Sequence, residues 1–287
     1  MPDLRVLNIE VTAERFASWL AWYAPARQPF LLSDAQVDEY GLIVGEPMTH
    51  PNPLRDTYEI YAQGDLRCVW LDRPGFDALP RPVRAALVRA QVTAGREAVP
   101  TVRAWAGRLG AEVREQADGY RFVWWPDLIA PVAADVLVPL IEDGVPPDRT
   151  EEVDERVWAA AAGRLPGARA LAGTFPDGSG PNCFGTVMAA AGVPGAAETW
   201  MLREPFEAWL AASTRPGGEN AEAGTVLLWR DRDGLVQHAG VTLGGGWALN
   251  KRSQTWMSPR AVARVADVVR SSRGPGMRLT RHAIVVC

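Results

Sequence analysis

The amino-acid sequence contains two kinds of hydrophobic periodicity, helical repeats and strand-like alternation, and the clearest helical repeat begins near residue 183. Apolar residues there follow the i, i+3, i+4, i+7 spacing of one helix face, at Phe184, Val187, Met188 and Ala191. The preceding segment 178–181 is rich in Gly and Pro, and Asn182 is a preferred N-cap residue. The pattern therefore predicts a helix that starts after Asn182 and has Cys183 in its first turn.

Three short strands are predicted between residues 224 and 250, where apolar residues alternate with small or polar ones. On the second strand, one face carries apolar residues suited to a core, at Ala239, Val241 and Leu243. The other face carries small and polar residues, as the wall of a cleft requires, at His238, Gly240 and Thr242.

The glycine triplet 244–246 determines how the second predicted strand pairs with the third. A three-residue loop buries Trp247 and places Gly240 opposite Asn250. Asn250 then shares a face with His238 at a diagonal distance of about 7–8 Å between backbones, within reach of a polar side chain. A two-residue loop would reverse the parity and move Asn250 to the other face.

These elements bring together the groups that a cysteine nucleophile needs. The backbone N–H groups and the dipole at a helix start favour an anion, so they would shift Cys183 toward the thiolate and could bind an oxyanion. His238 has the chemistry of the base that accepts the thiol proton, and Asn250 that of the group that orients the imidazole. We therefore predict that Cys183, His238 and Asn250 form a catalytic triad.

In order and spacing, the segments 182–185, 224–229 and 238–246 resemble the NlpC-type branch of the papain-like cysteine peptidases, known best from bacterial cell-wall endopeptidases. Asn250 falls twelve residues after His238, where that family has its third polar residue. The resemblance covers roughly residues 164–287. It implies a papain-like domain in which the nucleophile helix packs on an antiparallel sheet.

Two parts of the family pattern differ in this chain. Asn182 and Phe184 stand where the family has Asp and Ser, and the segment 173–180 lacks the Tyr-x-Trp-Gly-Gly pattern with which the family shapes its peptide site. Two hypotheses for function follow. In the first, the chain is a thiol-dependent hydrolase or acyltransferase that acts on a small amide- or peptide-like substrate rather than on intact cell wall. In the second, it is a catalytically inactive papain-like module that binds a protein partner.

The Pro-rich polar segment 144–150 is the predicted domain boundary. We expect a mixed α/β domain over residues 1–145 and the NlpC-like domain over residues 146–287, so that the fold class is α+β. Further elements are predicted as helices over 13–23, 128–142 and 259–269, a hairpin over 58–71, and strands over 120–125 and 277–286.

Composition and charge narrow the classes of function. Of the 287 residues 47% are hydrophobic and 22% charged, which is typical of a globular protein, and the net charge of −4 gives no general attraction to nucleic acid or anionic lipid. The N-terminus lacks a signal-peptide pattern, and the apolar segment 128–141 is interrupted by prolines and too short to span a bilayer. We expect a cytoplasmic bacterial protein that binds neither nucleic acid nor membrane.

The remaining cysteines and histidines predict no second site. The three cysteines are far apart and odd in number, which argues against a disulfide framework, and no paired Cys/His spacing predicts zinc. We expect Cys68 and Cys287 to be inert and His282 to be structural, while His50 has no partner in the sequence. The glycines 244–246 open no helix, so no nucleotide cofactor is predicted.

Overall fold

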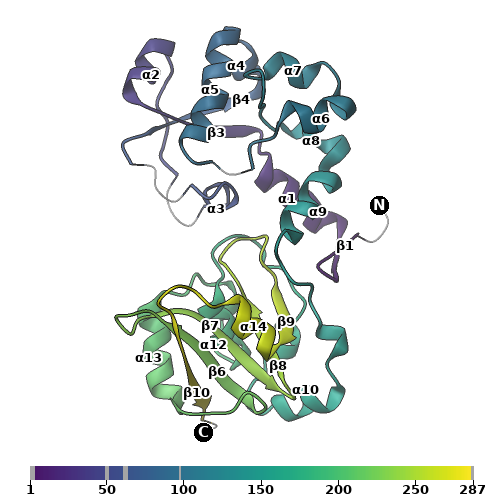
Figure 1. Ribbon diagram of the computed structural model, residues 1–287, viewed down its shortest axis with the longest axis vertical. Helices are drawn as coiled ribbons and strands as arrows, with labels where there is room; N and C mark the ends of the chain where they lie inside the picture. The colour runs from purple at the N-terminus through teal and green to yellow at the C-terminus, as the bar shows by residue number, and fades with distance from the viewer. Residues whose placement is uncertain (1–3, 49–51, 61–63, 97, 286–287) are drawn as a thin grey trace. The chain divides into compact units, whose positions relative to one another are not determined.

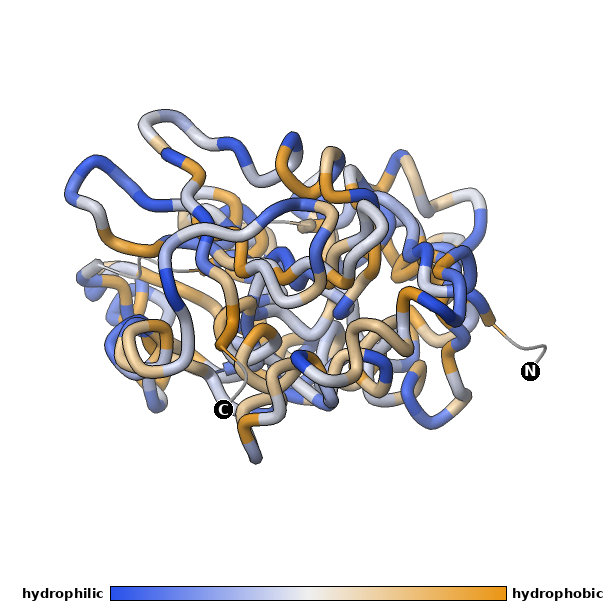
Figure 2. The backbone as a smooth tube through the Cα atoms, turned by 90° about the horizontal axis from the view of Figure 1, so that it is seen from below, coloured by the Kyte–Doolittle hydropathy of each residue, from blue (hydrophilic) through white to orange (hydrophobic). Residues whose placement is uncertain are grey.

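The computed structural model describes residues 4–48, 52–60, 64–96 and 98–285, and the chain divides into two compact units (Figure 1). One unit is Thr12–Leu140, and the other combines Met1–Val11 with Ile141–Cys287. Both contain helices and antiparallel strands, in agreement with the predicted mixture of helices and antiparallel sheets. Figure 2 shows only short hydrophobic stretches along the backbone, and none of the described helices is long and apolar enough to cross a membrane.

The unit Thr12–Leu140 has a core built around a two-stranded antiparallel sheet of β3 (Arg27–Leu32) and β4 (Arg67–Asp72). Aromatic rings of Phe30, Phe76 and Trp125 pack together in that core, with centroids 5.5–6.5 Å apart. The surrounding helices are α1 (Ala13–Tyr23), α2 (Asp34–Tyr40), α3 (Pro53–Thr57), α4 (Arg73–Asp77), α5 (Arg81–Thr93), α6 (Val102–Leu109), α7 (Glu112–Gln116), α8 (Pro126–Ile129) and α9 (Ala133–Glu142).

Two predicted elements of this unit are wrong. The hairpin over 58–71 does not form within the described residues, because β4 pairs with the distant β3, and Tyr58 instead caps α3 and donates a hydrogen bond to the Tyr23 carbonyl at 2.6 Å. Residues 61–63 of that prediction lie outside the described residues. The strand over 120–125 is reduced to one bridge between Thr101 and Arg121, because residues 122–125 have no partner strand in the described part of the chain and are instead buried as an irregular segment.

The second unit contains a six-stranded antiparallel sheet in the order β5-β10-β6-β7-β8-β9. Its strands are β5 (Thr214–Pro216), β6 (Ala223–Arg230), β7 (Val236–Gly244), β8 (Trp247–Lys251), β9 (Arg260–Arg264) and β10 (Arg278–Ile284). Its α-helices are α10 (Glu155–Ala161), α11 (Ala168–Leu171), α12 (Cys183–Ala190), α13 (Arg203–Ser213) and α14 (Val265–Ser271).

The two faces of this sheet are covered by different helices (Figure 1). The larger core lies between the sheet and α10, α12 and α13, and it includes Trp158, Phe184, Phe206, Val241 and Leu249. A smaller core lies under α14 on the opposite face, and it includes Leu227, Trp229, Ala248, Val265 and Val268. Residues that alternate along a strand therefore contact different helices.

The predicted helix over 259–269 is wrong in its first half. Residues Arg260–Arg264 form β9, which pairs with β8 along its whole length, and α14 starts only at Val265. On β9, the Val262 N–H donates to the buried carboxylate of Asp148 at 2.7 Å. Pairing with these two distant partners outweighs the local helical pattern.

The predicted domain boundary at residues 145/146 assigned Met1–Val11 to the N-terminal unit, whereas the structure groups them with Ile141–Cys287. The hairpin of β1 (Leu4–Val6) and β2 (Ile9–Val11) belongs with Ile141–Cys287. The Asp148 N–H donates to the Leu7 carbonyl at 2.8 Å, and the Asn8 side chain donates to the Asp148 carbonyl at 3.1 Å. This attachment depends on contacts across about 140 residues of sequence, as in the Asn8–Asp148 bond, so local patterns do not reveal it.

Gly185 allows α12 to pack closely against the segment 196–199. A Cβ added at Gly185 would overlap the Ala196 carbonyl oxygen and lie 3.1 Å from that of Thr199. Gly185→Ala is therefore expected to destabilise the protein by about 1–3 kcal/mol, despite the higher helix propensity of alanine. Chemical denaturation would measure the change. Gly107→Ala in α6, where an added Cβ meets nothing within 4 Å, is the control, and equal stability of the two variants would contradict the prediction.

Candidate functional site

Cys183 is the first residue of α12, as the sequence predicts, and its position is fixed by the preceding residue. The Asn182 side chain caps the helix: its oxygen accepts the Gly185 N–H at 3.1 Å. Its amide nitrogen donates to the Met201 carbonyl at 2.8 Å, which ties the helix start to a second loop. The Cys183 side chain is buried, with 9% of its surface exposed.

His238 and Asn250 lie side by side on β7 and β8 and are hydrogen-bonded. The distance from His238 Nε2 to Asn250 Oδ1 is 2.9 Å, and Gly240 pairs with Asn250 in the predicted register. With Oδ1 as the acceptor, Nε2 carries the proton and Nδ1 remains an acceptor. The Trp229 ring, with its centroid 5.1 Å from that of the imidazole, covers one side of His238.

The glycine loop produces the predicted pairing of Gly240 with Asn250, but through a shorter turn than predicted. Trp247 pairs with Gly244, so the turn is one residue shorter than predicted, and the pairing shifts between Thr242 and Gly244. This β-bulge absorbs the extra residue in β7 and restores the parity that a two-residue turn would reverse. Asn250 consequently remains on the face of His238.

The Cys183 sulfur lies next to the backbone of Ala239, the residue after His238, rather than next to the His238 imidazole. The sulfur faces the backbone N–H groups of Ala239 and Phe184. Both Cys183 and His238 are among the described residues, and no hydrogen bond joins them; the partner of His238 is Asn250. Strand alternation explains why Cys183 and His238 are not bonded. Ala239 points to the core under α12, whereas His238 points to the face of α14.

Burial sets the protonation states of both groups. Desolvation raises the pKa of the Cys183 thiol to about 11, although nearby backbone N–H groups and the charge of Lys251 oppose the shift. Desolvation likewise lowers the pKa of His238 to about 4, against the effect of its bond to Asn250. Both groups are therefore neutral at pH 7. The expected shift of Cys183 toward the thiolate is wrong for this conformation, because burial outweighs the helix start.

The raised pKa predicts slow alkylation of Cys183 by iodoacetamide at pH 7. Because the thiolate is the reactive form, the rate is expected to increase about tenfold per pH unit toward pH 11, whereas an ordinary thiol levels off above about pH 8.5. Peptide-resolved mass spectrometry would measure the rate at each cysteine. Cys68, whose pKa burial also raises to about 11, is the internal reference. A plateau for Cys183 below pH 8 would contradict the prediction.

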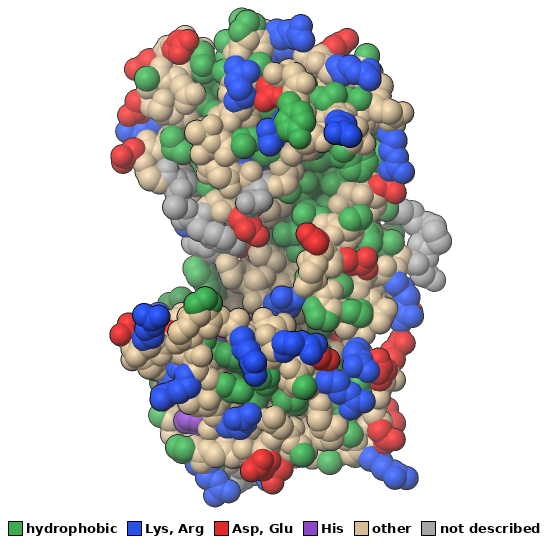
Figure 3. All heavy atoms as spheres, in the orientation of Figure 1, with side chains coloured by type: hydrophobic (Ala, Val, Ile, Leu, Met, Phe, Trp, Pro, Cys, Tyr) green, Lys and Arg blue, Asp and Glu red, His purple; other side chains and the backbone are tan. Residues whose placement is uncertain are grey.

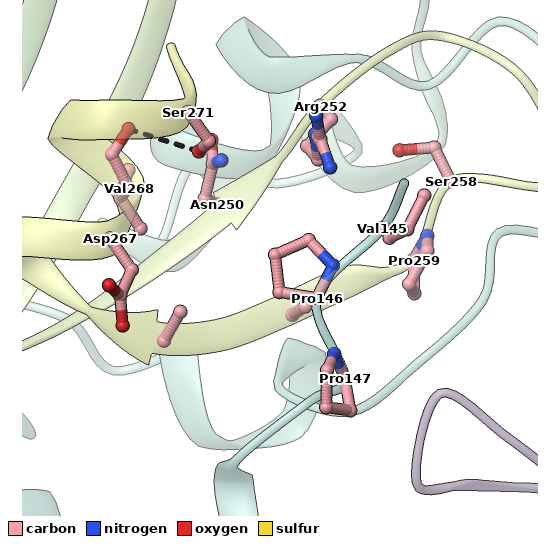
Figure 4. A pocket seen from close by; sticks show the side chains of 12 residues that line it. Val145, Pro146, Pro147, Asn250, Arg252, Ser258, Pro259, Asp267, Val268 and Ser271 are labelled. Carbon is pink, nitrogen blue, oxygen red and sulfur yellow. Dashed lines mark hydrogen bonds between the residues drawn. The ribbon is translucent and has the colours of Figure 1, made fainter. Parts of the chain in front are cut away.

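A small pocket adjoins Asn250 (Figure 4). It holds about 30 Å³, which is room for one or two water molecules. Apolar side chains form most of its wall, and the polar ones are Asn250, Arg252, Ser258, Asp267 and Ser271. Asn250 thus connects His238 to this pocket, which Cys183 does not line. Arg side chains are spread over the visible surface of the same unit (Figure 3).

Lys251, which follows Asn250 on β8, is a candidate site residue that no sequence motif predicted. Its side chain has no exposed surface, and its ammonium group donates to the carbonyls of Ser253, Thr255 and Ser258 at 2.7, 3.0 and 2.7 Å. A signal was present in the sequence: Lys251 is the only lysine among 30 lysine and arginine residues.

The other cysteines and histidines lie away from this site or outside the described residues. His282 Nδ1 is 3.0 Å from Thr214 Oγ1, between β10 and β5, and Cys68 is buried in the core of the other unit. His50 and Cys287 lie outside the described residues. Among the described side chains, no group of three or more His, Cys, Asp or Glu is arranged to hold a metal ion.

Comparison of the chain with protein-family models, curated proteins and solved structures finds no match. The interpretation of the site therefore rests on its own residues and their geometry.

Proposed function

We propose that the unit containing Ile141–Cys287 is a papain-like domain and that the protein is a thiol-dependent hydrolase or acyltransferase. Cys183 is the nucleophile, His238 the base and Asn250 the group that orients the base. The observation that carries this proposal is the bond of 2.9 Å between His238 Nε2 and Asn250 Oδ1, in a sheet that packs against the helix beginning with Cys183. The substrate is a small amide- or peptide-like molecule.

The Cys183 thiol and the His238 imidazole are both neutral at pH 7, which favours a reaction in which the imidazole acts as a general base on the thiol. With Nε2–H held by Asn250, Nδ1 of His238 is the atom that accepts the thiol proton as sulfur attacks the carbonyl carbon. The imidazolium then protonates the leaving amine or alcohol as its bond to carbon breaks. Water or another acceptor cleaves the resulting thioester and regenerates the thiol. The Cys183 N–H at the start of α12 is a donor for the oxyanion.

This chemistry requires Cys183 and His238 to approach one another when substrate binds. Cys183 packs in the core under α12, whereas His238 pairs with Trp229 on the face of the sheet that α14 covers, so the approach requires β7 to move relative to the start of α12. Catalytic hydrogen bonds are often long or absent without substrate and form in the complex. A shift of β7 relative to the start of α12 is therefore part of the proposal.

A second candidate function is a catalytically inactive binding module. The observation that favours it is the neutral, buried thiol of Cys183, which has no hydrogen bond to His238 in the described structure. In that case the His238–Asn250 pair is a structural link between β7 and β8.

A substrate screen separates the two functions. Wild type, Cys183→Ala and the control variant Cys68→Ala are incubated with short amides, γ-glutamyl peptides and acyl thioesters, and product is measured by mass spectrometry. The hydrolase proposal predicts turnover by wild type and Cys68→Ala and none by Cys183→Ala. Equal product formation in all three, together with tight binding of a protein partner by Cys183→Ala, would establish the binding module instead.

A further inference from the structure

The buried Lys251 has surroundings that fit an ammonium group and little else. Burying a charge is costly unless it is fully hydrogen-bonded, and the three N–H donors of lysine match three carbonyl acceptors here. A planar guanidinium presents its donors in a fixed fork and does not fit acceptors that converge on one point. Every other cationic side chain of this sequence is arginine, so the single lysine stands where arginine geometry is unsuitable.

The carbonyls bound by Lys251 belong to a segment, residues 252–259, that is attached to the loop before Cys183. The Gly180 N–H donates to the Gln254 carbonyl at 2.9 Å. The Trp256 N–H donates to Ser179 Oγ at 3.2 Å. Lys251 therefore folds this segment into the shape that holds residues 179 and 180, which lie four and three positions before the nucleophile.

Lys251 also lies on the side of the sheet that faces the thiol. Leu249, two residues earlier on β8, packs in the same core as Cys183, and alternation gives Lys251 the same direction. The charge of Lys251 acts on the thiol in the direction that favours the thiolate. On the adjacent strand, Arg260 pairs with Lys251 in register, and its guanidinium contacts the Ala197 carbonyl and Glu198 at 2.5 and 3.3 Å.

We propose that Lys251 is a positioning residue of the Cys183 site, which fixes the loop before the nucleophile and places a buried positive charge on the side of the sheet that carries the thiol. Its three N–H donors bind backbone carbonyls, so it acts through Cys183 and this loop rather than by contact with substrate. The proposal rests on the proposed function, since it assigns a role within the same site.

The first test compares alkylation rates of Cys183 in wild type and Lys251→Met at pH 8.5, with circular dichroism to verify folding. Removing a nearby charge is expected to slow alkylation of Cys183 about tenfold or more, while Cys68 in the same molecules is unchanged. A purely structural role would loosen the loop and leave Cys183 alkylation unchanged or faster, and that outcome would overturn the proposal.

The second test uses unsubstituted Lys251 and stays informative if Lys251→Met does not fold. Because the sequence has one lysine, labelling with ¹³Cε-lysine gives one side-chain resonance. Alkylation of Cys183 is expected to shift this resonance, and the same treatment of Cys183→Ala is expected to leave it in place. An unshifted resonance in the alkylated wild type would show that the Lys251 side chain is not close to Cys183, and would overturn the proposal. Neither test involves substrate, so failure of the Lys251 proposal is distinct from failure of the screen.

Discussion

Cys183→Ala is expected to lower kcat by about 10³-fold or more, and His238→Ala by a similar factor, for any substrate found in the screen. The two residues carry out one proton transfer and one bond formation together, so removing either removes the step. For the same reason, the double variant should be no slower than the single ones. Steady-state kinetics of the two single variants and the double variant measure this non-additivity.

The controls are variants of the same residue types outside the site. Cys68→Ala, in the core of the other unit, and His282→Ala, on β10, should keep kcat within about a factor of three of wild type if they fold. The alternative result is that the reductions in kcat caused by Cys183→Ala and His238→Ala multiply in the double variant. This would show that the residues act separately, and the triad would be abandoned.

Asp148→Ala is expected to cause the largest loss of stability among single substitutions considered for this protein, about 3–5 kcal/mol. The Asp148 side chain is 5% exposed, and its carboxylate accepts the Val262 N–H at 2.7 Å. It also accepts the Thr150 hydroxyl and N–H at 2.9 and 3.0 Å. Truncation leaves these buried donors without their acceptor. Chemical denaturation monitored by circular dichroism would measure the loss.

Two further variants make this prediction specific to the buried carboxylate. Asp143→Ala removes an exposed carboxylate from the same connecting segment and should change stability by less than about 0.5 kcal/mol. Asp148→Asn keeps one acceptor oxygen and should fall between wild type and Asp148→Ala. If Asp148→Ala is as stable as Asp143→Ala, the carboxylate does not hold β9 in place.

Local signals in the sequence were sufficient for several elements that define the site. The span of α1 and the start of α12 follow from caps and helical spacing, because both are encoded within a few residues. The pairing of Gly240 with Asn250 follows from the need to bury one strand face. The bond between His238 and Asn250 could therefore be predicted, whereas the bulge that produces it could not.

Features that depend on distant parts of the chain were not predictable. β4 pairs with β3, about 40 residues earlier, and β9 is held by the Asp148 carboxylate, 114 residues before Val262. The state of Cys183 is another example, since α12 is buried by residues of α13: the rings of Phe184 and Phe206 stack 4.4 Å apart. Desolvation is a property of that assembled core, so a helix start seen in sequence gave the wrong sign for the thiol pKa.

The division of the chain makes Thr12–Leu140 an insertion within the other unit, between the hairpin β1–β2 and Ile141. During synthesis the hairpin leaves the ribosome well before its partners Glu142 and Asp148, which emerge more than 130 residues later. At about 5–20 residues per second, this interval lasts several seconds or longer, during which the inserted unit can fold. The six-stranded sheet beneath the candidate site is complete only when β10 has emerged and paired with β6, so a nascent chain that stops before residue 278 lacks the finished sheet.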